Sequence, residues 1–434
     1  MQDSRSLDAA RRMLAFIDAS PSPFHACAEA ARQLEAAGFR PLAEVDAWPA
    51  GTGSYYVRRG GSLVAWSTGD HHGPATGFRI IGAHTDSPNL RVKPRPDAGR
   101  VGYRQLAVEV YGGALLNSWL DRDLGLSGRV VVRGPAGTEE RLLLVDRPLL
   151  RVPQLAIHLD REISTNGLLL NAQQHLSPIW GLGDPTPSGF TAFVAAELDV
   201  APGAILAWDL MTHDLTPSTL LGVDEELVSA PRLDNLCSSW AGVEALVGAT
   251  ADGGSPTQIP LLVLFDHEEI GSSSARGADS TLLPALTERI VLGLGGGRED
   301  VLRALAASVC CSADNAHATH PNYADRHEPN HLIALNAGPV LKVNSNVRYA
   351  TDATSAAHFV QACEQAAVPY QRYAHRSDLP CGSTIGPITA SRLGIPTFDV
   401  GAPQLAMHSA RELCGSADPA HYTAAMAAFL APAV

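Results

Sequence analysis

Short apolar runs that end in ionisable residues are the feature that most constrains the fold of this 434-residue chain. The clearest run spans residues 259–265 and is followed at once by Asp266, His267, Glu268 and Glu269. Such a run is typical of a buried parallel strand. Four ionisable groups at its end are costly to desolvate unless a cation or strong hydrogen bonds compensate them. One glutamate could bind a metal while the other acts as general base on a bound water, and a solvated turn is the structural alternative.

A second strand-end cluster follows the apolar residues 78–81, where His84 precedes Asp86 by two positions. A lone histidine in such a place is often a satisfied core residue. A nearby carboxylate, however, can fix the tautomer and ring orientation of a metal-bound imidazole. His84 is therefore a candidate ligand.

Three further positions carry the same kind of chemistry. Asp314 follows the run 309–311, Asp234 precedes a predicted helix, and His408 comes after the predicted strand 395–400. An Asx turn or a helix cap would explain each aspartate alone. Taken together, two histidines and three carboxylates suit a pair of zinc-like ions, and ligands bind beyond the strand ends of open α/β sheets.

The chain changes character along its length. Residues 8–38 predict two amphipathic helices interrupted at Pro21 and Pro23. Alternating stretches between residues 92 and 227 predict short antiparallel strands with an exposed loop at 182–189. We expect a catalytic domain in two parts, 1–91 and 228–434, with an inserted β-rich domain at 92–227.

After residue 236 the sequence again alternates between predicted strands and helices, and these strands are expected to join the strand at 78–81 in one sheet. The expected strands are at 259–265, 289–293, 308–312, 339–344 and 395–400, and the expected helices at 238–251, 355–367 and 421–430.

The amino-acid composition argues against several classes of function. With 45% hydrophobic and 18% charged residues, the chain has the make-up of a globular protein. Its formal charge of -13 repels phosphate backbones and anionic lipids, so we expect no nucleic-acid or membrane partner. The N-terminus resembles neither a signal peptide nor a membrane span. Seven scattered cysteines without a CxxC pair indicate reduced thiols and a cytoplasmic location.

Nine ordered motifs resemble the M18 family of metallo-aminopeptidases, and within it the aspartyl aminopeptidases. They are GAHTDSP, SWLDRDL, QLAIHLDR, PRLDNL, DHEEIGS, SADNAHATHPN, GPVLKVN, CGSTIGP and MHSARE, between residues 82 and 412. The resemblance implies a mixed-sheet, three-layer α/β/α zinc-peptidase domain with an inserted β-rich dimerisation domain. It also implies a homo-oligomer, expected to be a dimer-based dodecamer with an enclosed chamber that admits peptides.

The resemblance also implies a role for each matching residue. His84 and Asp314 would hold one divalent ion, Glu269 and His408 the other, and Asp234 would bridge them. Zinc is expected, and cobalt or manganese can occupy similar ligands.

The same resemblance assigns residues outside the ligand set. Glu268 would be the general base, Asp86 the carboxylate that orients the site, and His158 a histidine lent to a neighbouring subunit. A preference for N-terminal Asp or Glu would come from the cation Lys342, with Tyr349 in the same pocket. A dinuclear deacylase of N-acyl amino acids is the alternative enzyme. A non-catalytic scaffold would predict broken ligands, and each ligand position is intact.

Overall fold

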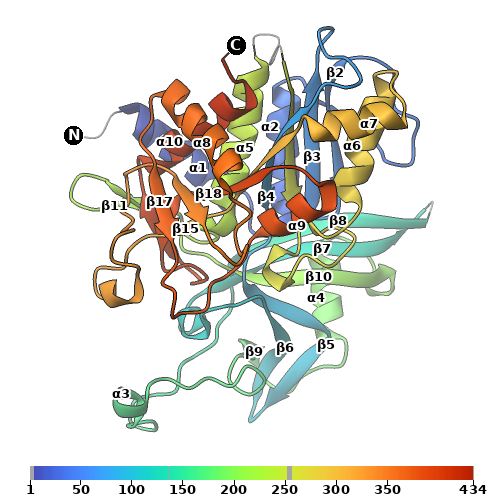
Figure 1. Cartoon of the computed structure of the whole chain (residues 1–434). Helices are drawn as coiled ribbons and strands as arrows, with labels where there is room; N and C mark the ends of the chain where they lie inside the picture. Colours follow the sequence, from blue (N-terminus) through green and yellow to red (C-terminus); the bar gives the residue numbers. More distant parts are fainter. Residues whose placement is uncertain (1–3, 136, 252–256, 434) are drawn as a thin grey trace. The chain divides into compact units, whose positions relative to one another are not determined.

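A computed structural model describes residues 4–135, 137–251 and 257–433 (Figure 1). The chain forms two compact units. The first comprises Met1–Asp86, Ser218–Met407 and Glu412–Val434, and the second comprises Ser87–Pro217 and His408–Arg411. The sequence pattern places the insertion at 92–227, whereas the observed unit begins at Ser87, ends at Pro217 and includes the short segment His408–Arg411.

A nine-stranded mixed sheet organises the first unit. In spatial order its strands are β1 (Arg40–Pro41), β2 (Gly53–Arg59), β3 (Ser62–Thr68), β13 (Ile259–Phe265), β4 (Phe78–His84), β14 (Val309–Ala313), β18 (Thr397–Gly401), β16 (Val340–Val343) and β17 (Gln371–Ala374). Strands β4, β13 and β14 run parallel to one another at the centre, whereas β3 is antiparallel to β13 and β16 is antiparallel to β18.

Side chains that alternate along the central strands serve two separate cores. Ile81 and Leu262 join one hydrophobic cluster, while their neighbours Ile80 and Leu261 join the other. A strand exposes successive side chains to opposite faces, so a central strand with helices on both sides is apolar throughout. The mixed-sheet α/β/α arrangement expected from the sequence is confirmed.

Helices cover both faces of this sheet (Figure 1). One face carries α1 (Ser4–Asp18), α2 (Pro23–Ala36), α5 (Leu233–Thr250), α8 (Ala353–Ala366) and α10 (Asp418–Leu430). The other face carries α6 (Leu282–Gly293), α7 (Arg298–Ala306) and α9 (Ile385–Leu393).

Local sequence signals account for several of these helices. Pro23 occupies the first turn of α2, and the Ser22 hydroxyl accepts a hydrogen bond from the backbone amide of His25. Asp352 and Ser355 form a reciprocal capping box at the start of α8.

The strand predicted at 289–293 is wrong, because these residues form the end of α6. Leu283, Leu286 and Ile290 are buried at three- and four-residue spacing along that helix. The apolar run at its end is one turn of a helical stripe, and a run of that length does not distinguish a strand from a buried helix. The other four strands and the three helices expected after residue 236 are confirmed.

A smaller sheet completes the first unit. Its five strands are β11 (Thr219–Leu221), β12 (Leu227–Ala230), β20 (Glu412–Gly415), β19 (Pro403–Leu405) and β15 (Ala316–His317), in spatial order. Short 3₁₀ turns occur at η3 (Glu268–Ile270) and η4 (Ala324–Arg326).

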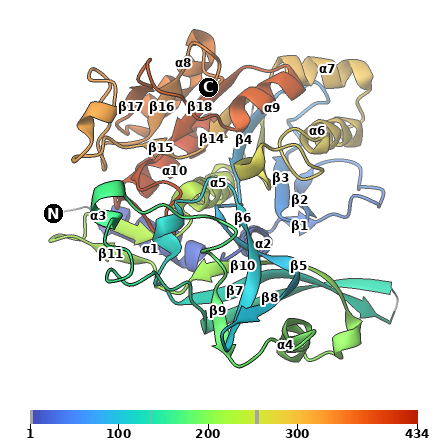
Figure 2. The ribbon, with the colours of Figure 1, turned by 90° about the horizontal axis from the view of Figure 1, so that it is seen from below.

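The second unit is built on an antiparallel six-stranded sheet (Figure 2). In spatial order its strands are β8 (Gly137–Leu150), β7 (Leu124–Gly134), β10 (Ile205–Asp214), β5 (Asn89–Arg100), β6 (Tyr103–Tyr111) and β9 (Ile179–Leu182). Helix α4 (Gly189–Glu197) buries Phe190 and Val194 in the core of this unit. The remaining short elements are α3 (Ile163–Asn166), η1 (Leu116–Trp119) and η2 (Pro202–Ala204).

Among the described helices, none combines the length and the apolar character that a membrane crossing requires.

Candidate metal centre

The parallel strands β4, β13 and β14 deliver ionisable residues to one edge of the large sheet. His84 is the last residue of β4 and pairs in register with Phe265, the last residue of β13. Asp314 directly follows β14, which runs parallel to β4. Because parallel strands end at the same edge, residues that are far apart in sequence meet there.

His84 is fully buried at the centre of this edge. Its Nδ1 lies 3.0 Å from the backbone carbonyl oxygen of Asp86. A carbonyl only accepts, so Nδ1 carries the proton and Nε2 offers a lone pair. Nε2 lies 3.4 Å from Asp234 Oδ1, 3.7 Å from Asp314 Oδ1 and 3.9 Å from Glu268 Oε2.

Electrostatics at His84 follow from these neighbours. Burial lowers the pKa of His84, but the carboxylates of Asp234, Asp314 and Asp86 outweigh it and hold the pKa well above its usual value. Several anions around one imidazole therefore favour a positive charge at this point. A divalent cation would supply that charge without protonating the ring.

Asp234 enters the cluster from the first turn of α5. The peptide bond between Asp234 and Asn235 is cis. The backbone amide of Asp234 donates to Glu412 Oε2 at 2.9 Å, and the Asn235 side chain donates to the carbonyl of Ala313 at 2.8 Å. These bonds tie the start of α5 to the first residue of β20 and the last residue of β14.

Glu268 and Glu269 lie on the turn η3, which begins three residues after the last residue of β13. Asp86 holds this turn, because its Oδ1 accepts from the Glu268 amide and its Oδ2 from the Glu269 amide, each at 3.1 Å. Burial raises the pKa of Glu268 to about 8. The nearby His84 lowers this pKa, whereas Asp314, Asp86 and Asp234 raise it further. Glu268 is thus placed among groups that disfavour its charged form.

Two overlapping sets of donor atoms result from this arrangement. His84, Asp234 and Asp314 each offer one ligand atom within 4.8 Å of the other two, and all three residues are buried. Asp234 and Glu269 also offer carboxylate oxygens within 4.8 Å of each other. One imidazole nitrogen with several carboxylate oxygens fits zinc chemistry. Asp234, common to both sets, has the two oxygens that a bridging ligand needs.

Lys342 is buried beside Asp314. Its Nζ donates to the carbonyl oxygens of Asp314 at 2.8 Å and Asn315 at 3.2 Å, and lies 3.8 Å from Asp314 Oδ2. The ammonium also stands 5.1 Å from the centroid of the Tyr349 ring. The structure therefore brings Lys342 and Tyr349 together, with the lysine attached to the segment that carries Asp314.

Two of the residues singled out from the sequence belong to the second unit. His408 lies there with its Nδ1 3.0 Å from the carbonyl oxygen of Gly113. His158 lies on an exposed turn between β8 and α3.

Three polar residues that hold the first unit's cluster in place were not predicted. Glu412 is buried and accepts from the Asp234 amide, while Asn315 donates to Leu233 O at 2.8 Å. Ser239 donates to the carbonyl of His84 at 2.7 Å. Glu412 and Asn315 lie inside the motifs MHSARE and SADNAHATHPN. Their place in these motifs is the sequence feature that could have identified them as part of the site.

Comparison with known proteins agrees with this geometry. A profile of the family described as "Aminopeptidase I zinc metalloprotease (M18)" matches residues 16–430. The chain is 55% identical over 421 residues to a "Probable M18 family aminopeptidase 2" of Streptomyces coelicolor, and the match covers 97% of each chain.

Solved structures give the same result. The chain resembles one in the "Cryo-EM structure of the Ape4 and Nbr1 complex" with a TM-score of 0.93 and 37% identity, over 99% of this chain and 87% of that one. It resembles the S. cerevisiae mApe1 dodecamer with a TM-score of 0.85 and 28% identity, over 98% of this chain and 97% of that one. The chain therefore belongs to the M18 family of aminopeptidases, which are zinc metallopeptidases.

Proposed function

We propose that this protein is a dinuclear metallo-aminopeptidase that removes N-terminal residues, preferentially Asp or Glu, from peptides. The observation that carries the proposal is the convergence of Asp234, Asp314 and Glu268 on Nε2 of His84 within 4.0 Å, inside the protein. Such a group of anions is stable when cations neutralise it.

The match to the M18 family suggests how two ions would be held. His84 and Asp314 would bind one ion, Glu269 and His408 the other, and Asp234 both. Zinc suits these nitrogen and oxygen donors, and cobalt or manganese can replace it. The protonated Nδ1 of His84 leaves Nε2 for the metal, which is the tautomer that binding requires.

Bound metal would supply Lewis acidity and lower the pKa of the attacking water. Glu268 would take the proton of that water and pass it to the leaving amine, so one residue acts first as base and then as acid. Asp86 would keep the Glu268 carboxylate in place through the amide of that residue. His158 from a neighbouring subunit would donate to the developing oxyanion.

Lys342 is the proposed source of the preference for acidic residues. The chain contains only two lysines, Lys93 and Lys342, against 30 arginines among its 32 basic residues. Lys342 is the buried one. Its hydrogen bonds go to two neutral carbonyls, and its ammonium also lies 3.8 Å from Asp314 Oδ2. Its positive charge would favour a substrate carboxylate in a neighbouring pocket walled by Tyr349.

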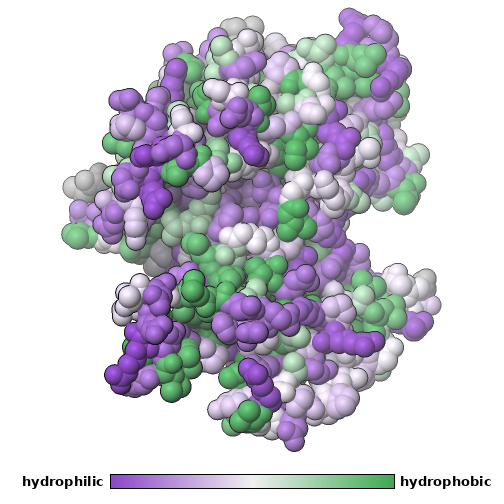
Figure 3. All heavy atoms as spheres, turned by 60° about the horizontal axis from the view of Figure 1, so that its bottom comes forward, coloured by the Kyte–Doolittle hydropathy of each residue, from purple (hydrophilic) through white to green (hydrophobic). Residues whose placement is uncertain are grey.

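An assembly of several copies is part of the proposal. Leu155, Ile157 and Leu159 surround His158 and are 57%, 55% and 76% exposed. Figure 3 shows apolar side chains standing among polar ones on the face that it presents. Exposed apolar residues that gather on one short segment are typical of protein interfaces. They are consistent with a dimer that brings His158 to the neighbouring site, and with a dodecamer built from such dimers.

A cytoplasmic location is also proposed. All seven cysteines are free thiols, and six of them are buried. Burial raises the pKa of Cys27 and Cys237, which keeps these thiols protonated and inert. Thiols of this kind suit a reducing compartment.

The experiment that tests the function measures zinc per chain and the hydrolysis of Asp-, Glu- and Ala-derivatised amine substrates before and after chelation. We expect two equivalents of zinc, highest kcat/KM on the acidic substrates, and loss of activity on chelation that zinc restores. Activity that survives a strong chelator would contradict the proposal. Faster hydrolysis of N-acylated amino acids than of free-amine substrates would favour the deacylase instead.

A further inference from the structure

The segment His408–Arg411 belongs to the second unit, although the strands on either side of it, β19 and β20, belong to the first. The chain thus leaves one unit for four residues and returns. A residue on such a segment is positioned by contacts with the β-rich unit. Contacts inside the second unit therefore help to set where the His408 ring lies.

Backbone groups of the second unit hold His408 itself. Its carbonyl oxygen accepts from the Leu115 amide at 3.0 Å, and its Nδ1 lies 3.0 Å from the Gly113 carbonyl oxygen. Nδ1 must be the donor, so in the neutral ring the lone pair is on Nε2. His408 also has φ +67°, a left-handed conformation that a non-glycine residue keeps only when its surroundings impose it.

An ion cluster around the buried Asp214 holds the end of the same segment. Asp214 has a side chain that is 1% exposed, and its two oxygens lie 3.3 Å from Arg122 Nη1 and 3.5 Å from Arg411 Nη1. Arg411 also donates to the carbonyl oxygen of Thr216 at 2.6 Å. The planar guanidinium presents several N–H donors in a fixed fork, so Arg411 can serve a carboxylate and a carbonyl at once.

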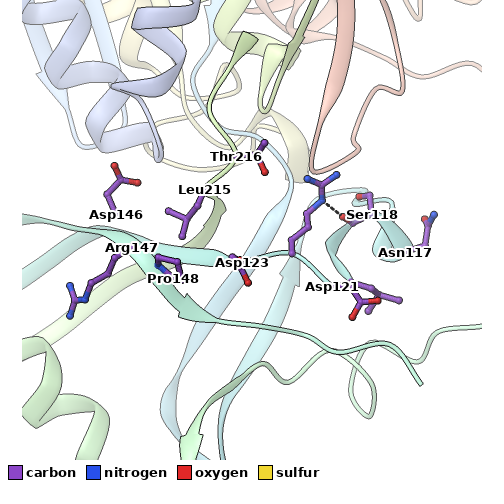
Figure 4. A pocket seen from close by; sticks show the side chains of 11 residues that line it. Asn117, Ser118, Asp121, Asp123, Asp146, Arg147, Pro148, Leu215 and Thr216 are labelled. Carbon is purple, nitrogen blue, oxygen red and sulfur yellow. Dashed lines mark hydrogen bonds between the residues drawn. The ribbon is translucent and has the colours of Figure 1, made fainter. Parts of the chain in front are cut away.

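Ser118 joins the cluster to the backbone of the segment. Its hydroxyl accepts from the Ala410 amide at 2.8 Å, and its carbonyl accepts from Arg122 Nε at 2.6 Å, the bond drawn in Figure 4. A polar cavity of about 780 Å³ borders Ser118, Arg122 and Thr216 (Figure 4). The cavity borders this side of the cluster, and the directed bonds of Arg122 and Arg411 hold the two guanidinium groups there.

We propose that the cluster of Asp214, Arg411 and Arg122 is a positioning device that aims Nε2 of His408 at its metal. This inference rests on the proposed role of His408 as a ligand. It gives the inserted unit a task beyond assembly, because its own ion pairs set the affinity of one metal position. The three charged residues are positioning residues, since they act through His408 and its segment.

The test titrates zinc into metal-depleted full-length protein with a competing chelator and resolves the two binding equivalents. Asp214→Asn and Arg411→Lys should weaken one equivalent by roughly 10- to 100-fold, as removal of a residue that orients a ligand does. The other equivalent should keep its affinity. The matched control is Glu197→Gln, which removes the exposed partner of Arg147 in the same unit and should change neither equivalent.

Gly113→Ala provides an independent route to the same ring. A Cβ at Gly113 would lie 3.1 Å from His408 Nδ1, so the ring must shift while the ion cluster stays whole. We expect zinc binding to weaken at the same single equivalent. This variant therefore tests the proposal even if Asp214→Asn does not fold. Two unaltered equivalents in folded Arg411→Lys and Gly113→Ala would overturn the positioning role. Two unaltered equivalents in His408→Ala would instead overturn the ligand assignment in the proposed function, so the two failures are distinguishable.

Discussion

Asp86 Oδ1 accepts a hydrogen bond from the backbone amide of Glu268 at 3.1 Å, across a sequence separation of 182 residues. The other oxygen of the same carboxylate accepts from the amide of Glu269. One side chain thus sets the turn that carries both the proposed base and a proposed ligand.

Asp86→Asn should therefore reduce kcat and the affinity for zinc together, each by roughly 10- to 100-fold. The asparagine amide would present a donor to one of two backbone N–H groups that need an acceptor. Steady-state kinetics and metal titration measure the two effects. Asp46→Asn, a change at an exposed carboxylate, is the control and should leave both at wild-type values. A fall in kcat with unchanged zinc affinity would show that Asp86 does not hold Glu269.

Glu268→Gln should keep both zinc equivalents and lose at least about 10²-fold in kcat, the contribution of a general base. The amide has nearly the same shape but cannot take a proton. The measurement is kcat at saturating substrate on protein of verified metal content, with the exposed residue Glu299 changed to Gln as the control. Near-normal turnover would exclude Glu268 as the base.

Lys342→Met should lower kcat/KM for Asp-substrates at least 10-fold more than for Ala-substrates, because only the Asp-substrates have a side-chain carboxylate that would interact with the lysine. The change also leaves the carbonyls of Asp314 and Asn315 without their donor, so the free energy of unfolding should fall by about 1–3 kcal/mol. Lys93→Met, at the only other lysine, is the matched control. Equal losses on both substrates would assign Lys342 to the support of Asp314 alone.

The burial of Asp418 predicts that the stability of the protein depends on pH, independently of catalysis. Burial raises its pKa to about 7 from 3.8, although the backbone amides of Asn336, Gly338 and Gly415 oppose the shift. Between these values the folded protein keeps the proton and the unfolded chain releases it. The free energy of unfolding should then fall as pH rises from about 4 to 7, by at most about 1.4 kcal/mol per pH unit, and level off above.

Asp418→Asn should remove this part of the slope. Urea unfolding at pH 5 and at pH 7.5 would show a smaller difference in the variant than in the wild type. Asp8→Asn, at an exposed carboxylate on α1, should keep the wild-type difference. Equal differences in all three proteins would show that Asp418 ionises normally in the folded state.

The sequence by itself determined the strands that matter and the residues at their ends. The runs before His84, Asp266 and Asp314 are buried strands of one sheet, because apolar length and a polar boundary are local properties. The same rule failed at residues 289–293, where the apolar stretch is the C-terminal end of helix α6. Five residues are too few for periodicity to distinguish a strand from a helix.

Tertiary structure alone decided how these residues are held. Asp86 accepts from Glu268 and Glu269, and Glu412 accepts from Asp234, through hydrogen bonds between segments more than 170 residues apart. Only the folded chain assigns His408 to the β-rich unit, beside Asp214 and Arg411. A pattern along the chain shows which groups can donate or accept, but the partner of each group depends on which segments packing brings within about 3 Å.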